Sequence, residues 1–180
     1  MPITPYHFGP NAFFAFLFRK WIDIPVFILA NVIIDVEVLF AASWPQHRYW
    51  HWHSLFIGTV VGIIWGLSAY PLRNLLKKSM KLLRIPYDTN LKKMVISGVL
   101  GIWMHVIFDS IYHYDVQPFW PYPKNPLWKL GKLRVTHDQT KMICGLFMVG
   151  AILIYVSILK IYAKKKKVLD ARQAAENRTS

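Results

Sequence analysis

The chain has 180 residues, of which 54% are hydrophobic, and its formal net charge is +13. The hydrophobic share exceeds the roughly 45–50% of ordinary soluble domains, and the length suits a single domain. One cysteine, Cys144, excludes an internal disulfide framework and a cysteine-rich zinc cluster. The N-terminus lacks the basic segment and the small-residue cleavage site of a secretory signal, so we expect no removable signal peptide.

The chain begins with a proline-rich segment and a short apolar run at residues 12–18. This run is too short to cross a bilayer and predicts a half-span, a re-entrant piece or an interfacial helix. Four later runs have the length of transmembrane helices, for which about 17–25 mostly apolar residues are needed. They are residues 24–43, 54–70, 94–114 and 142–162.

These elements predict an all-α, polytopic membrane helical bundle. Residues 1–163 are expected to form one membrane-embedded domain, and residues 164–180 a basic polar tail that is disordered. Within the second expected span, Ser54, Gly58, Gly62 and Gly66 recur at four-residue spacing. Small residues in that register allow another helix to approach closely.

The basic residues give the expected orientation. Arg19 and Lys20 precede the first expected span, and lysines and arginines crowd both the connection after the second span and the tail after the fourth. The connection after the first span carries only Arg48. By the positive-inside rule we expect a multi-pass protein of the cell (inner) membrane with a cytoplasmic C-terminus. Anionic lipid near the membrane surface is the expected partner of the basic tail, and we expect no nucleic acid.

Histidines and carboxylates gather toward the opposite, extracytoplasmic ends of these spans. His105 and Asp109 lie four residues apart in the third expected span, so a helix points both side chains the same way. A carboxylate at membrane depth costs roughly 2.5–3.5 kcal/mol and therefore indicates a functional role. Asp35 comes from the end of the first span, and His53 directly precedes the second.

Asp35, His53, His105 and Asp109 can together form the four-ligand shell that zinc prefers, with bonds of about 2.0–2.2 Å. A metal-bound water would be acidified to a hydroxide nucleophile. Asp35 or Glu37 would then act as base or orienting group, and Arg48 would hold an anionic oxygen.

Each candidate also has a simpler interpretation. His47 and His51 are either ligands or interfacial hydrogen-bonding groups, and His113 and His137 are weaker ligand candidates. The pair of His105 with Asp109 is also compatible with a structural hydrogen bond, or with a proton or ion relay in a transporter.

Several segments carry a family resemblance: Thr4–Gly9 with His7, Ala30–Glu37, His47-Arg48 followed by His53-Ser54, Gly101–Ser110, and the stretch from Asp115 to Pro121. In this order they resemble the YdjM-like group of bacterial and archaeal inner-membrane proteins, known as membrane-bound metal-dependent hydrolases. That group is in turn similar to zinc-dependent phospholipase C and P1 nuclease.

The resemblance implies metal ligands at His7, Asp35, His53, His105 and Asp109, with Asp109 bridging two zinc ions and His7 on the second. The phospholipase pattern also has a later His-x-x-x-Glu pair. Here the matching positions are His137 and Lys141, so a three-metal site is not expected.

The hypothesis is hydrolysis of a phosphoester or lipid headgroup at the extracytoplasmic face, with one or two zinc ions or another divalent metal. The alternatives are a non-enzymatic transporter or carrier of metal or protons, and a structural membrane protein whose polar residues only hold helices together.

Overall fold

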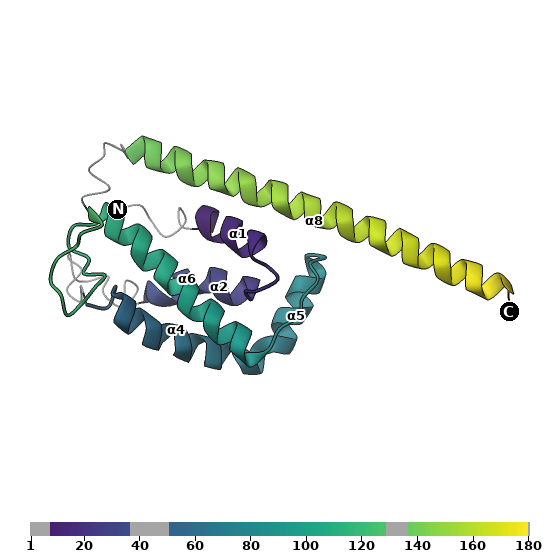
Figure 1. Ribbon diagram of the computed structural model, residues 1–180, viewed down its shortest axis with the longest axis horizontal. Helices are drawn as coiled ribbons and strands as arrows, with labels where there is room; N and C mark the ends of the chain where they lie inside the picture. The colour runs from purple at the N-terminus through teal and green to yellow at the C-terminus, as the bar shows by residue number, and fades with distance from the viewer. Residues whose placement is uncertain (1–7, 37–50, 129–136, 180) are drawn as a thin grey trace.

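The structure is a computed structural model that describes residues 8–36, 51–128 and 137–179 (Figure 1). Throughout these ranges every regular element is a helix, as the sequence predicts. The elements are α1 (Phe8–Leu17), α2 (Ile24–Ile34), α4 (Leu55–Ala69), the single 3-10 turn η2 (Tyr70–Leu72), α5 (Arg73–Leu82), α6 (Leu91–Tyr112) and α8 (His137–Thr179).

Three helical stretches are long and apolar enough to cross a membrane: Leu55–Leu82, Leu91–Ile111 and Asp138–Gln173. The third stretch contains the fourth expected span. The first two overlap most of the second and third expected spans, which begin one residue earlier and end three residues later, respectively. The first expected span begins as the 11-residue helix α2, and its remainder, residues 37–43, lies outside the described residues. The short apolar run at residues 12–18, expected as a half-span, a re-entrant piece or an interfacial helix, lies mostly in α1, whose 10 residues extend for about 15 Å, half the thickness of a bilayer core.

Polar side chains start three of these helices. Asp23, Ser54 and Asn90 precede α2, α4 and α6, and each side chain accepts a hydrogen bond from the backbone N–H three residues later. Such N-caps satisfy a backbone donor that would otherwise lack a partner at the helix start. Pro25 lies in the first turn of α2, where a missing N–H costs little.

The small residues at four-residue spacing, Gly58, Gly62 and Gly66, pack α4 against α6. A Cβ added to Gly62 would lie 2.6 Å from the Cα of Val99, and one added to Gly58 would lie 2.8 Å from Cγ2 of Ile102. Successive glycines along α4 meet residues of α6 that lie progressively earlier in the chain, so the two helices are antiparallel. On another side of α6, Gly101 meets the carbonyl of Phe27 on α2. Backbone contact therefore fixes α6 between two neighbours.

α8 lies along α1 on the outer side of the bundle (Figure 1). Gly9 sits against the backbone of Cys144, and the rings of Phe13 and Phe147 are 5.3 Å apart. Beyond the bundle, α8 continues as a helix to Thr179 (Figure 1), where the sequence analysis expected a disordered tail. This segment is rich in Ala, Lys and Arg, which have high helix propensity and can extend a helix without a packing partner.

A buried polar network joins the start of α2 to the connection between α5 and α6. The carboxylate of Asp23 accepts hydrogen bonds from the hydroxyls of Tyr87, at 2.7 Å, and Thr89. The backbone N–H of Asp23 donates to Oγ of Ser97 at 2.6 Å. At this end of the bundle, the hydroxyl of Tyr155 on α8 also donates to the carbonyl of Leu83 at 2.9 Å. The segments that carry most of the basic residues thus meet at one end.

Candidate metal centre

Two histidines and two aspartates from three helical elements meet at the other end of α6. They are Asp35, His53, His105 and Asp109, and one ligand atom from each lies within 4.8 Å of all the others. Asp35 is the C-cap of α2, and His53 stands one residue before the N-cap of α4. His105 and Asp109 lie one turn apart on α6. The structure thus brings together the four residues that the sequence analysis chose as a ligand shell.

The distances within this cluster suit a small cation. Nε2 of His105 is 3.2 Å from Oδ1 of Asp35 and 3.0 Å from Oδ2 of Asp109. Nε2 of His53 is 3.4 Å and 3.9 Å from the same two oxygens. In a tetrahedral zinc site with bonds of about 2.1 Å, the ligand atoms are about 3.4 Å apart. The four nitrogen–oxygen distances scatter around that value, so the donor set fits the ion that its chemistry suggests.

The cluster is largely shielded from solvent. The side chains of His105 and His53 are 1% and 4% exposed, and those of Asp109 and Asp35 are 12% and 15% exposed. Ile34 and Val106, which directly precede Asp35 and follow His105 in the chain, belong with Ile102 to a buried apolar cluster. Two carboxylates so close together repel each other in such surroundings, and a cation or protonated imidazole between them offsets that cost. The carboxylate side of the cluster is its more open side.

Trp52 holds the two chain segments that bring His53 to Asp35. Its indole Nε1 donates to the carbonyl of Ile34 at 3.1 Å, so residues 52 and 34 are joined, and their neighbours His53 and Asp35 face each other. The N–H of Leu55 donates to the carbonyl of Pro118 at 2.8 Å, which anchors the start of α4 to the proline-rich segment. Both contacts fix His53 from outside the ligand set.

Asn31 positions the imidazole of His105 from the opposite ring edge. Its Oδ1 lies 3.3 Å from Nδ1 of His105 and accepts a hydrogen bond of 2.6 Å from Nδ2 of Asn11. Its Nδ2 donates to the carbonyl of Ile28 at 2.9 Å, which fixes the orientation of the amide. An oxygen acceptor at Nδ1 favours the tautomer in which Nε2 carries the lone pair that a metal binds.

The other predicted site residues lie elsewhere or outside the described residues. The ring of His51 is 6.0 Å from that of Trp120, and His113 is the C-cap of α6; neither joins the group of four. His137 is the first residue of α8, and its side chain is not described. His7, Glu37, His47 and Arg48 lie outside the described residues.

Sequence reasoning did not assign positioning roles to Asn31 and Trp52. For Asn31 the signal was present: its four-residue spacing from Asp35 on one helix face, which also faces His105. No sequence spacing indicates the role of Trp52, because its indole donates to a backbone carbonyl 18 residues away in the chain.

The profile of the YdjM inner membrane protein family matches residues 22–168, which is most of the chain and includes all four clustered residues. The chain belongs to this family. Neither a curated protein nor a solved structure matches it. Together with the three apolar helical stretches, family membership makes the chain a multi-pass protein embedded in the inner membrane.

Proposed function

We propose that this YdjM family member is a metal-dependent hydrolase that acts on a phosphoester at the extracytoplasmic surface of the membrane, with zinc as the best-fitting ion. The observation that carries the proposal is the convergence of four donor atoms within 4.8 Å of one another. Imidazole nitrogens combined with carboxylate oxygens are donors that zinc binds well, whereas magnesium and calcium prefer oxygen alone.

His105 and His53 would hold the ion from the buried side, and Asp109 and Asp35 would bind it from the more open side and neutralise its charge; a water would join as a fifth ligand. When bound, the ion would supply Lewis-acid polarisation of a phosphoryl oxygen and acidify a water molecule. Asp35, on the more open side of the cluster, would serve as base or as the group that orients the attacking water. Three predicted roles stay predictions, because their residues lie outside the described ranges: Glu37 as a base, Arg48 as the group that holds an anion, and His7 as a ligand of a second ion.

The depth of the site supports a membrane-surface substrate. Asp109 lies in the last turn of α6, whose 22 residues extend for about 33 Å and therefore cross a bilayer core of about 30 Å. With α6 across the membrane, the cluster would lie near the boundary between lipid tails and headgroups. A lipid headgroup phosphoester reaches that depth without leaving the membrane.

Metal content and turnover measured on the same preparations test this function. We expect purified wild-type protein to retain about one zinc per chain, and His105→Ala and Asp109→Asn to lose it. His51→Ala is the matched control, because His51 lies outside the group of four. The wild type should also cleave a chromogenic phosphodiester or phospholipid in mixed micelles. Equal zinc in all four proteins, or zinc binding without any turnover, contradicts the hydrolase.

A metal carrier is the second candidate, and one observation favours it. Four protein ligands complete a tetrahedral shell, whereas catalytic zinc sites usually keep one position open for water. Zinc uptake into proteoliposomes by the wild type, abolished in His105→Ala and unaccompanied by phosphoester cleavage, would assign this function instead.

A further inference from the structure

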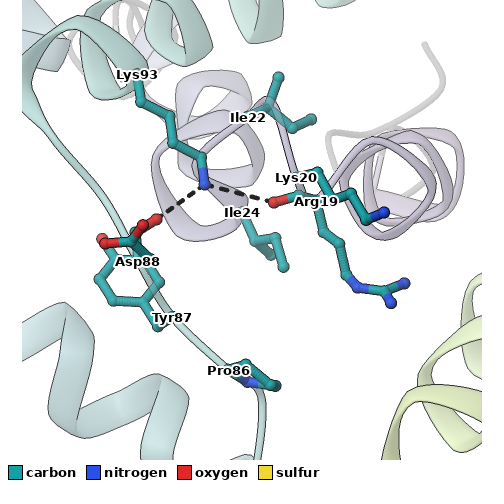
Figure 2. Close-up of a pocket in the computed structure, with 8 residues that line it drawn as sticks. All are labelled: Arg19, Lys20, Ile22, Ile24, Pro86, Tyr87, Asp88 and Lys93. Atoms are coloured by element: carbon teal, nitrogen blue, oxygen red, sulfur yellow. Dashed lines mark hydrogen bonds between the residues drawn. The ribbon is translucent and has the colours of Figure 1, made fainter. Parts of the chain in front are cut away.

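A basic pocket lies at the end of the bundle opposite the metal centre. It has a volume of about 380 Å³ and lies between the α1–α2 connection and the segment that enters α6. Figure 2 shows Arg19 and Lys20 on one wall, with Tyr87 and Asp88 across from them. Lys93 stands in the first turn of α6, 12 residues before His105, which places the two about 18 Å apart along the helix.

The residues that line the pocket carry a net positive charge, which favours an anionic ligand. Arg19, Lys20 and Lys93 contribute three positive charges, and Asp88 contributes the one carboxylate. The ammonium of Lys93 donates to the carbonyls of Asp88, at 2.8 Å, and Arg19, at 3.4 Å, which fixes it between the two walls (Figure 2). An ammonium has three donors, so Lys93 can still bind an anion there.

Exposed aromatic side chains adjoin the pocket. Next to Arg19 and Lys20, the side chain of Trp21 is 69% exposed and that of Phe18 is 42% exposed. Aromatic residues beside cations are typical of the headgroup layer at the end of a membrane helix. Ile22 and Ile24 add apolar lining to the same pocket. A ligand with one anionic end and one apolar end matches this mixture.

We infer that this pocket binds the phosphate headgroup of an anionic phospholipid, in the leaflet that faces the basic end of the bundle. The guanidinium of Arg19 would pair with the phosphate oxygens, Lys20 and Lys93 would add charge, and the glycerol end would lie over the isoleucines. This site is independent of the metal centre and of the proposed hydrolysis, because it shares no residue with either.

The test uses the full-length protein in detergent, titrated with phosphatidylglycerol and separately with phosphatidylcholine, with bound lipid counted by native mass spectrometry. We expect phosphatidylglycerol to bind more tightly, and the double variant Arg19→Gln/Lys20→Gln to weaken it by roughly 30-fold. The matched control is Lys165→Gln/Lys166→Gln, which removes the same charge from the exposed part of α8 and should leave the affinity nearly unchanged. Equal thermal unfolding midpoints without lipid confirm that both variants fold.

Three results would overturn the inference. Equal binding of the two lipids would show that headgroup charge is not recognised. Equal loss in the pocket variant and the α8 variant would show that only overall charge matters. Inorganic phosphate that displaces phosphatidylglycerol at comparable concentration would assign the pocket to free phosphate instead of a lipid.

Discussion

Oδ1 of Asn31 lies 3.3 Å from Nδ1 of His105, on the ring edge opposite the two carboxylates. The same oxygen accepts a hydrogen bond from Asn11, so α1, α2 and α6 meet at one buried amide. This amide orients an imidazole whose other nitrogen is 3.0 Å from Asp109. Helix packing and the geometry of the candidate metal centre therefore depend on the same group.

Asn31→Ala should weaken zinc binding by about 10- to 100-fold, the usual cost of losing a group that orients a metal-bound histidine. Asn31→Asp keeps an oxygen acceptor for the imidazole N–H and should retain more affinity than the alanine variant. Competition with a chromogenic chelator measures both. Equal affinities for wild type and alanine variant would show that Asn31 serves packing alone.

Removing the ion should destabilise the fold, because its ligands join α2, the segment before α4, and α6. A ligand present at 100 times its dissociation constant stabilises the folded state by about 2.7 kcal/mol. We expect a chelator to lower the thermal unfolding midpoint of the wild type and added zinc to restore it. His105→Ala should show neither response, and a chelator effect of equal size in this variant would contradict the site.

Trp52→Phe should also lower zinc affinity, although Trp52 is not a ligand. The substitution removes the hydrogen bond of 3.1 Å to the carbonyl of Ile34 and releases the segment that positions His53. The stability cost should be about 0.5–1.5 kcal/mol. Trp21→Phe, at an exposed position in the connection between α1 and α2, is the control and should leave the affinity unchanged. Identical affinities in both variants would contradict the positioning role.

Gly62→Ala should destabilise the packing of α4 on α6 by about 1–3 kcal/mol. Its new Cβ would lie 2.6 Å from the Cα of Val99, and backbone atoms cannot move aside as a side chain can. Gly145→Ala on α8 meets nothing within 4 Å and should raise stability by up to about 1 kcal/mol through helix propensity. Unfolding by a denaturing detergent compares the two. A neutral Gly62→Ala would show that the helices are not in close contact.

Tyr87 should make the stability of the protein sensitive to alkaline pH. Burial and the neighbouring Asp23 carboxylate, which accepts its hydrogen bond, raise the pKa of the Tyr87 phenol above its usual value. The unfolded chain then releases this proton near pH 10 while the folded chain keeps it. The contribution to stability is thus present below about pH 10 and is lost as the pH rises toward the folded pKa. Tyr87→Phe should flatten the fall in unfolding midpoint above pH 10, and an equally steep fall would contradict the assignment.

The helical class and most of the candidate site could be predicted from local sequence. Long apolar runs have few stable arrangements in lipid other than helices, which satisfy every backbone hydrogen bond internally. The four-residue spacing of His105 and Asp109 fixes their common face, and the glycine spacing of α4 gives its contact surface. The sequence analysis did not predict that α8 extends to Thr179. The charged residues of this segment suggested disorder, but lysine and arginine also have high helix propensity.

The sequence by itself determined which residues could bind a cation and at which end of each helix they stand, because both follow from residue chemistry and helical period. Only the tertiary structure decided that Asp35, His53, His105 and Asp109 are close enough to share an ion. Their 3.0–3.9 Å separations depend on how closely α2 and α4 approach α6 and on the contacts of Asn31 and Trp52. Such distances arise from contacts between segments far apart in the chain, which local spacing does not specify.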